Sequence, residues 1–190
     1  MKRRVARIEH VSESVVEAAV PLAAEGEAAE SFEALYRRTF PRVYGYVASL
    51  LFDRATAEDV TAQAFERAYR KRWTFRASRG SADAWIFGIA RNAALDELRR
   101  RKRTVALQAD AESPSSQEPE EYAELSLRRE TVRAALATLD ARERDIVFLK
   151  FSGGLSHAEI AKVLRISESN AGTRLHRALE KLRKACHDDA

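Results

Sequence analysis

Apolar residues recur every three or four positions along two stretches of the chain, which is the spacing of amphipathic helices. In the first stretch, the recurring positions are Phe32, Leu35, Tyr36, Val43, Val47, Leu50 and Leu51, then Val60, Ala64, Phe65 and Ala68, and then Trp85, Ile86, Ile89, Ala93 and Leu98. In the second stretch, they are Leu127, Val132, Leu136, Leu139, Ile146, Val147 and Leu149. No segment alternates apolar and polar residues convincingly, so the pattern predicts an all-α fold.

Capping and helix-breaking residues within the first stretch predict where its helices begin and end. Pro41 is expected to bend or divide the first segment, because proline cannot donate a helical hydrogen bond. Thr56 with Asp59 resembles the capping start of the second helix. Trp73–Gly80 is expected to be a loop, and Ser81 is expected to cap the third helix.

Two capping boxes organise the second stretch. Asp140 with Glu143 starts one helix, and Ser156 with Glu159 starts the next. Ser167 then caps a last helix that ends strongly basic. A short helix, a tight turn and a basic helix form the layout of a helix-turn-helix, whose second helix enters the major groove of DNA.

The charge is distributed very unevenly along the chain. Residues 31–103 carry sixteen Lys and Arg against eight Asp and Glu, a net +8, and residues 126–187 carry thirteen against seven, a net +6. Residues 104–125 contain six acids and no basic residue, and their Pro- and Ser-rich composition is typical of a linker. The prediction is two small helical domains, 31–103 and 126–187, joined by an acidic linker and preceded by a weakly ordered extension, 1–30. Two basic domains suggest a polyanion bound at two places.

The composition and motifs of the chain exclude several other classes of protein. The single cysteine excludes an internal disulfide, and no apolar run is long enough to insert into a membrane, so a cytoplasmic protein is expected. Cys186 and His187 are adjacent, but two neighbouring ligands do not make a metal site. The sequence shows no catalytic His spacing and no phosphate-binding loop, so neither an enzyme nor a cofactor is predicted.

The last helix carries the candidate chemistry for reading duplex DNA. Ala171 and Leu175 are expected to face inward. The outward face is expected to present Asn170, Thr173, Arg174, His176 and Arg177. Arg can donate two hydrogen bonds to guanine, and Asn can form two hydrogen bonds with adenine. A merely solvated face is the competing interpretation, and the one-sided chemistry favours DNA.

The first domain interleaves aromatic and basic residues, a composition suited to unpaired strands, because bases stack on rings while cations hold the backbone. Burial in the core is the alternative for each ring. The helical spacing of Phe65 and Trp85 favours the core. Trp73 and Phe75 lie in the expected loop, and for them both interpretations stay open.

Three motifs in order resemble the extracytoplasmic-function (ECF) sigma factors of bacterial RNA polymerase. They are AEDVTAQAFERAYRK (Ala57–Lys71), AWIFGIARNAALDELRRRKR (Ala84–Arg103), and LSHAEIAKVLRIS followed by TRLHRALEKLRK. The resemblance covers about residues 31–186. It implies two helical domains: the first binds the polymerase β′ clamp helices and the unwound −10 element, and the second binds the −35 element and the β flap.

The resemblance also implies residue roles. The residues that match the polymerase-binding helix are Asp59, Val60, Gln63 and Phe65. Those expected at the −10 element are Trp73, Arg76 and Arg79, in a loop similar to the one that pockets a flipped base, and Asn92, Asp96 and Arg99 on the following helix. Those matching the −35 reading helix are Asn170, Thr173, Arg174, His176 and Arg177. The acidic linker would thread through the polymerase's RNA path, and relatives commonly have an anti-sigma partner.

Two positions depart from the family's pattern. Arg165 stands in the turn where members often have glycine, and a left-handed backbone there costs arginine roughly 1 kcal/mol relative to glycine. Gly172 stands on the reading helix where members often have a basic residue, and it should weaken the helix locally.

The predicted function is a sigma factor that directs polymerase to specific promoters and stabilises the melted −10 region. A conventional helix-turn-helix regulator with a helical sensor or dimerisation domain is the first alternative, and it would bind an operator by itself, usually as a symmetric dimer. A helical RNA-binding protein is the second, and an enzyme acting on nucleic acid is the third.

Overall fold

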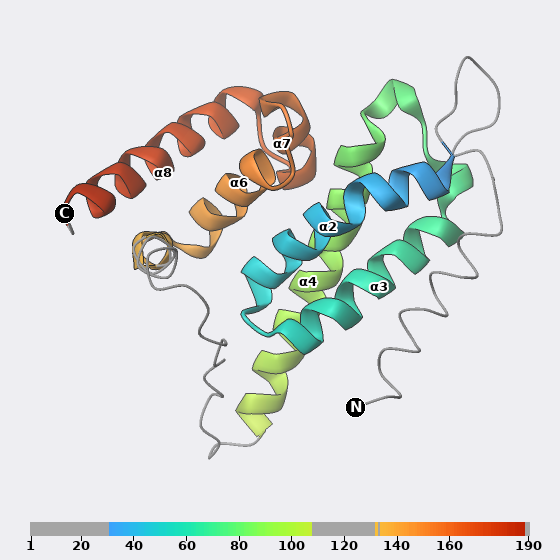
Figure 1. Ribbon diagram of the computed structural model, residues 1–190, viewed down its shortest axis with the longest axis horizontal. Coiled ribbons are helices and arrows are strands. Elements are labelled where there is room, and N and C mark those ends of the chain that lie inside the picture. Colours follow the sequence, from blue (N-terminus) through green and yellow to red (C-terminus); the bar gives the residue numbers. More distant parts are fainter. Residues whose placement is uncertain (1–30, 108–131, 133, 189–190) are drawn as a thin grey trace. The chain divides into compact units, whose positions relative to one another are not determined.

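The computed structural model describes residues 31–107, 132 and 134–188. Every regular element in these ranges is a helix (Figure 1), so the predicted all-α class is confirmed. The chain divides into two compact units, with the division after Thr104.

The first helix, α2 (Phe32–Leu51), runs unbroken through Pro41. The prediction that Pro41 divides this segment is therefore wrong. Proline removes only the hydrogen bond to the carbonyl of Arg37, and both residues are exposed, so water can solvate that carbonyl. Buried side chains on both sides of the proline keep the two halves of the helix on one core.

The second helix, α3 (Arg54–Arg70), begins two residues before Thr56, the residue expected to cap it. Its N-cap is Asp53, whose carboxylate accepts hydrogen bonds from the Thr56 amide (3.2 Å) and hydroxyl (2.8 Å). Thr56 therefore donates to the cap instead of being the cap. The αL conformation of Phe52 (φ 52°) ends α2 and leads directly into this start.

The expected loop Trp73–Gly80 is mostly two single turns of 3-10 helix, η1 (Arg72–Thr74) and η2 (Ala77–Arg79). The long helix α4 (Ala82–Leu107) follows, and the Ser81 hydroxyl accepts from the Ala84 amide (3.1 Å), as predicted for a cap.

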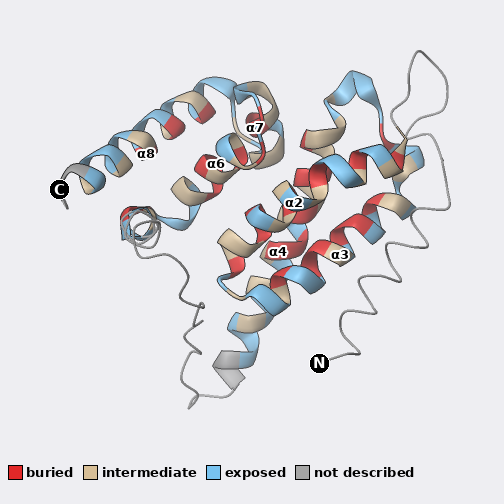
Figure 2. Cartoon of the chain, in the orientation of Figure 1, coloured by how far each residue is buried: buried red, intermediate tan, exposed pale blue. Residues whose placement is uncertain are grey.

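Aromatic side chains form much of the core of the N-terminal unit. Figure 1 shows α2 and α3 running antiparallel, with α4 crossing them. The ring of Phe65 on α3 packs edge-on against Tyr36 on α2, with centroids 4.9 Å apart. Phe87 on α4 packs against Tyr46 on α2 at 5.5 Å. The buried faces of these helices point inward (Figure 2), so three helices share one core.

The C-terminal unit contains α6 (Ala141–Phe151), α7 (His157–Leu164) and α8 (Glu168–Asp188). Both predicted capping boxes are confirmed, at Asp140 with Glu143 and at Ser156 with Glu159. Ser167 caps α8 by accepting from the Asn170 amide at 3.2 Å, also as predicted. The core here is aliphatic, and its largest fully buried side chains are Ile146, Leu149, Leu155 and Ile160.

The predicted extension, 1–30, lies outside the described residues, as does the predicted acidic linker from residue 108 onward. The first four residues of that predicted linker, 104–107, instead continue α4. No helix in the described part of the chain combines the length and apolar character that crossing a bilayer requires.

Candidate nucleic-acid interface

Helix α8 has one buried and one exposed face. Ala171, Leu175 and Ala178 are buried, and α8 packs with them against α6 and α7. Among the side chains predicted to read DNA, Arg174 is half-buried and the others are exposed: Asn170, Thr173, His176 and Arg177. The inward and outward faces therefore fall where the sequence pattern placed them.

Two of the exposed side chains on α8 have local contacts. The Thr173 hydroxyl donates to the Ser169 carbonyl (3.0 Å), which is a common arrangement for a threonine inside a helix. His176 Nδ1 lies 3.7 Å from the Glu180 carboxylate, and both side chains are mostly exposed. Such surface pairs contribute little to stability, so they can exchange for contacts with a ligand.

The turn between α7 and α8 reverses the chain at Arg165. This residue is in the left-handed region (φ 56°, ψ 49°), which confirms the backbone condition under which arginine costs more than glycine. The Ile166 amide donates to the Ala161 carbonyl (3.0 Å), so the reversal closes the end of α7. At Gly172 a Cβ would have nothing within 4 Å, so no neighbouring group in its unit requires a glycine there.

Polar bonds fix α8 and the loop before α7 onto α6. The Lys181 ammonium on α8 pairs with Glu143, a member of the first capping box. The Lys150 ammonium lies 3.4 Å from the Leu155 carbonyl, across the loop that joins α6 to α7. Gly153 in that loop is buried, and a Cβ there would overlap the Leu149 carbonyl. Any side chain at this position would therefore force the backbone of the loop to shift.

The turn after α3 separates the two aromatic residues whose roles the sequence left open. Phe75 is 7% exposed and packs against Trp85, with centroids 5.4 Å apart. Trp73 is 50% exposed. The Arg76 guanidinium donates to the carbonyls of Trp73 (2.8 Å) and Phe75 (3.0 Å), so this predicted DNA-binding residue also fixes the turn. Phe75 belongs to the core, while Trp73 stays accessible to a ligand.

One exposed line of α4 carries the other predicted −10 residues. Asn92, Asp96 and Arg99 are spaced by four and three positions, and all are exposed. Arg99 donates to Asp96 at 2.9 Å. Predicted Arg79, in η2, is also exposed. The structure thus brings Asn92, Asp96 and Arg99 onto one face of the N-terminal unit.

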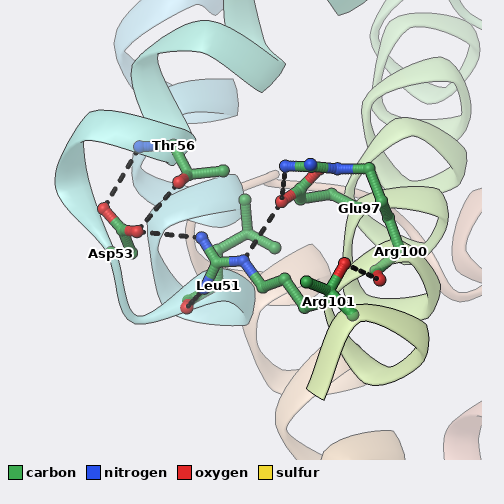
Figure 3. A network of polar contacts seen from close by, with 7 residues as sticks. Leu51, Asp53, Thr56, Glu97, Arg100 and Arg101 are labelled. Atoms are coloured by element: carbon green, nitrogen blue, oxygen red, sulfur yellow. Dashed lines mark hydrogen bonds and ion pairs between the residues drawn. The ribbon is translucent and has the colours of Figure 1, made fainter. Parts of the chain in front are cut away.

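The basic run at the end of α4 is partly used inside the protein (Figure 3). Arg101 donates to the Asp53 carboxylate (2.9 Å), the Leu51 carbonyl (3.3 Å) and Glu97 (3.1 Å). Arg100 makes two bonds to Glu97, each 2.8 Å long. Arg101 thereby ties α4 to the turn between α2 and α3, so it is a structural residue.

These contacts shift the acidity of both carboxyls. Hydrogen bonds from Thr56, first from its hydroxyl and then from its amide, hold the pKa of Asp53 below its ordinary value, and Arg101 adds to this. The hydrogen bonds from Arg100 do the same for the pKa of Glu97. Both carboxylates therefore stay charged at neutral pH.

The predicted polymerase-binding residues on α3 divide into two pairs. Asp59 and Gln63 are exposed and one turn apart. Val60 is 4% exposed and Phe65 is fully buried. The buried pair cannot present a surface to a partner, since their side chains hold α3 on the core. Their contribution to such a helix is to position Asp59 and Gln63.

The described residues contain no group of three or more His, Cys, Asp and Glu side chains placed to hold a metal ion. Cys186 is exposed near the end of α8.

Comparisons with known proteins match both units. The Sigma-70 region 2 family model matches residues 35–104, and the Sigma-70 region 4 model matches residues 129–182. The ECF RNA polymerase sigma factor SigX of Bacillus subtilis is 32% identical over 165 residues, covering 82% of this chain and 83% of its own length. The chain belongs to the ECF RNA polymerase sigma factors.

Two further relatives agree with this. The ECF sigma factor BldN of Streptomyces coelicolor is 32% identical over 171 residues and covers 88% of this chain, which in turn spans 64% of that relative's length. The sigma factor RpoE of Bartonella quintana, solved in complex with the anti-sigma factor NepR, has the same fold, with a TM-score of 0.70 at 24% identity over 84% of this chain and 98% of that one. The function of this protein is therefore promoter-specific transcription initiation with RNA polymerase. The alternative, a conventional helix-turn-helix regulator, is not favoured.

Sequence reasoning missed several side chains that shape the site. Asp83 at the start of α4 bonds Arg38 (2.5 Å) and Arg42 (2.7 Å) on α2, and no local pattern pairs residues more than forty positions apart. No sequence pattern indicated that Arg72, one of the basic residues interleaved with the aromatic ones, contacts the rings of both Tyr69 and Trp73. An acid in the first turn of a helix was the available signal for Asp83, and it was ambiguous because such acids also serve the helix dipole.

Proposed function

We propose that three exposed surfaces of this sigma factor divide the work of promoter recognition. The C-terminal unit reads the −35 duplex through α8. Arg174 and Arg177 supply the donors that guanine accepts, and Asn170 supplies the paired donor and acceptor that adenine needs. Thr173 and His176 lie within the same face and contact phosphate or base edges.

The N-terminal unit holds the unpaired non-template strand of the −10 element. Asn92 and Arg99 on α4 offer hydrogen bonds to base edges or phosphate, and Asp96 orients Arg99 through their 2.9 Å bond. Trp73 offers a ring for stacking, while Arg76 and Arg79 supply positive charge beside it. Binding separated bases stabilises the open strand, and this is how the protein promotes initiation while the polymerase performs the chemistry.

The remaining contacts are with proteins. Asp59 and Gln63 on the exposed side of α3 bind the β′ clamp helices of the polymerase core, and the C-terminal unit contacts the β flap. An anti-sigma factor is the regulatory partner that we expect, as NepR is for RpoE. The protein works in the cytoplasm, where bacterial RNA polymerase acts. The path of residues 104–125 through the polymerase's RNA channel stays a prediction.

The division of α8 into two faces is the observation that supports this proposal most. Its buried face consists of small and aliphatic groups, Ala171, Leu175 and Ala178, so the helix is held rigidly on α6 and α7. Its other face consists of hydrogen-bonding side chains of the kinds that read base edges. A helix with this composition, following a left-handed turn, suits insertion into a major groove.

Three substitutions separate the three surfaces in reconstituted transcription with bacterial core polymerase. Arg177→Ala should weaken promoter use by about 1–3 kcal/mol while core binding is unchanged. Asp59→Ala should weaken core binding. Asn92→Ala should impair opening or −10 choice while −35 contact is kept. Core binding is measured by fluorescence anisotropy, −35 contact by footprinting, and opening by permanganate reactivity of unpaired thymines.

Matched variants control for loss of charge and of folding. Arg142→Ala removes an exposed arginine from α6 that is not one of the proposed reading residues, and should leave promoter use unchanged. If the parent chain binds promoter DNA tightly as a dimer without core polymerase, the conventional regulator is the better description. If the three substitutions act alike through loss of helical signal, the assignment of separate surfaces is wrong.

A further inference from the structure

Arg72 lies between two aromatic rings at the turn that follows α3. Its guanidinium carbon is 4.0 Å from the centroid of the Tyr69 ring and 4.6 Å from that of Trp73. One terminal nitrogen donates to the Tyr69 carbonyl at 2.7 Å. Its Nε is buried and has no hydrogen-bond partner among the described residues. Ring faces and one carbonyl, therefore, hold this arginine in place.

Trp73 is fixed from two sides and is still available. Arg76 bonds the carbonyls of Trp73 and Phe75, and the buried Phe75 ring anchors the turn against Trp85. Arg72 lies over one face of the indole. Trp73 as a residue is nevertheless 50% exposed, so part of it remains accessible to a ligand.

A held ring binds better than a free one. Tryptophan is the aromatic side chain that attracts a cation most strongly, and the attraction grows when the cation is partly withdrawn from water. Because Arg72 already restricts the indole, less side-chain freedom is lost when a ligand stacks on the open face. The ligand suited to such a face, beside several cations, is an unpaired base.

We propose that Arg72 is a positioning residue, which holds the indole of Trp73 so that its open face stacks on one unpaired base of the melted promoter. This rests on the proposed function of the N-terminal unit. The competing role for Arg72 is a direct phosphate contact. Its buried Nε and its carbonyl bond leave it poorly placed for that, whereas Lys71 and Arg79 are exposed.

The first test uses the free full-length chain and needs neither polymerase nor DNA. The chain has two tryptophans, so Trp85→Phe leaves Trp73 as the single indole. In that background Arg72→Lys keeps the charge but loses the planar group that contacts both rings. We expect Trp73 to lose fluorescence anisotropy and to become more quenchable by acrylamide. Unchanged anisotropy and quenching in Arg72→Lys would overturn the positioning role.

Arg70→Lys is the matched control for that experiment. Arg70 is also an arginine of the same basic segment, but its bond goes to Glu66 on the exposed side of α3 (2.6 Å). It should leave the fluorescence of Trp73 unchanged. Far-UV circular dichroism of each variant establishes that the helices are intact. An equal effect of Arg70→Lys would mean that the signal reports charge instead of the ring contact, and would also overturn the proposal.

The second test places 2-aminopurine at successive non-template positions of a −10 bubble bound to holoenzyme. Excitation at wavelengths that tryptophan does not absorb isolates the base. Trp73→Ala should raise the fluorescence at one position and weaken binding of the bubble roughly 5- to 150-fold, the range expected for one lost stacking contact. Arg72→Lys should change the same position to a smaller extent, and Arg70→Lys should not change it.

Three failures are distinguishable. If Trp73→Ala changes no position although its holoenzyme forms and opens promoters, stacking on Trp73 is wrong and the proposed function stands. If Arg72→Leu lowers the salt dependence of bubble binding while Arg72→Lys behaves as the parent, Arg72 is a phosphate ligand and the positioning role is wrong. If the parent chain never joins core polymerase, the proposed function fails, and the free-chain measurement decides the role of Arg72 by itself.

Discussion

In the described residues, α2, α3 and α4 pack around one core and α6, α7 and α8 around another, but different interactions hold the two units of this sigma factor together. In the N-terminal unit, large rings such as Tyr46, Phe65 and Phe87 fill the interior, and ion pairs between distant residues join the helices. In the C-terminal unit, the interior is aliphatic, and bonds between neighbours in sequence set the helix ends. The difference shows that two kinds of core can support DNA-binding surfaces. An aromatic core with long-range ion pairs supports the proposed surface for melted DNA, and an aliphatic core with local helix caps supports the proposed reading helix.

The same contrast extends to the charged side chains of the two proposed DNA surfaces. On α4, Arg99 pairs with Asp96 and Arg100 with Glu97, so part of the basic run is neutralised within the helix. On α8, Arg177 is exposed at the C-terminal end of the proposed reading face. Reading base edges requires hydrogen-bond donors that can bind the DNA. Holding an unpaired strand requires mainly side chains that are fixed in position.

The largest expected effect tests whether the two cores are independent. Phe65→Ala should destabilise the N-terminal unit by about 3–5 kcal/mol, because it empties a fully buried ring site. Both tryptophans belong to this unit, so tryptophan fluorescence during urea unfolding reports it selectively. The milder Phe65→Leu keeps a measurable transition if the alanine variant unfolds outright.

Ile160→Ala in α7 is the counterpart of that substitution. It should lower the stability of the C-terminal unit by about 2–5 kcal/mol, seen by circular dichroism, while the fluorescence transition stays in place. Fluorescence and circular dichroism transitions that move together in both variants would show that the two cores unfold as one.

A smaller effect is expected at the glycine of the loop between α6 and α7. Gly153→Ala should cost about 1–3 kcal/mol, because the new Cβ would overlap the Leu149 carbonyl and force a backbone shift. Gly154→Ala is not a matched control, since Gly154 has a positive φ (60°). Gly172→Ala in the same unit is the suitable control. Equal stability of Gly153→Ala and the parent, measured by circular dichroism in urea, would contradict the overlap.

Acid should reveal the ion pairs of the N-terminal unit. The pKa values of Asp53 and Glu97 are lowered in the folded state from ordinary values of 3.8 and 4.5. The unfolded chain then binds more protons, so their stabilisation is present above about pH 4.5 and is lost as the pH falls through the folded pKa values. Asp53→Asn keeps a capping oxygen but loses the charge, and should cost about 1 kcal/mol or less at neutral pH.

This loss is measured from the urea midpoints of tryptophan fluorescence between about pH 3 and pH 7, because carboxyl groups titrate in the lower part of that range. Asp53→Asn should flatten the acid limb of that curve. The C-terminal unit has its own acid-sensitive group, because hydrogen bonds led by the Glu143 amide lower the pKa of Asp140. An unchanged acid limb in Asp53→Asn would show that the pair with Arg101 does not contribute.

The smallest expected effects compare a helical glycine in each unit. A Cβ at Gly45 in α2 or Gly172 in α8 would have nothing within 4 Å. Each substitution by alanine should therefore stabilise its unit by roughly 0.5–1 kcal/mol, by reducing the freedom of the unfolded chain. Gly45→Ala should appear in the fluorescence transition and Gly172→Ala only in circular dichroism. A loss of stability in either variant would contradict the open space around that glycine.

The ease of predicting these features from sequence follows the range of the interactions. Capping boxes join residues three apart, so the starts of α6 and α7 were predicted correctly. The start of α3 was missed because Asp53 and Thr56 offer the same short-range pattern as Thr56 and Asp59, and the turn at Phe52 decides between them. Pro41 was misjudged because burial on both sides of it is a tertiary effect.

The proposed site shows the same limit. The exposed face of α8 followed from helical period alone. The period could not decide between Trp73 and Phe75, since both lie in a turn. It did favour the core for Phe65, which is fully buried, although the family resemblance also assigned Phe65 to polymerase binding. The bonds of Arg101 to Asp53 and of Asp83 to Arg42 join residues 48 and 41 positions apart, and no local sequence pattern predicts such pairs.

The bonds of Arg101 have a mechanical consequence. Beyond Leu107 the chain continues toward the second unit, so tension along the chain reaches the first unit at the last turns of α4. Arg101 is fastened there to the Asp53 carboxylate and the Leu51 carbonyl. A pull on this end is therefore delivered to the corner between α2 and α3, and the helix resists peeling away one turn at a time.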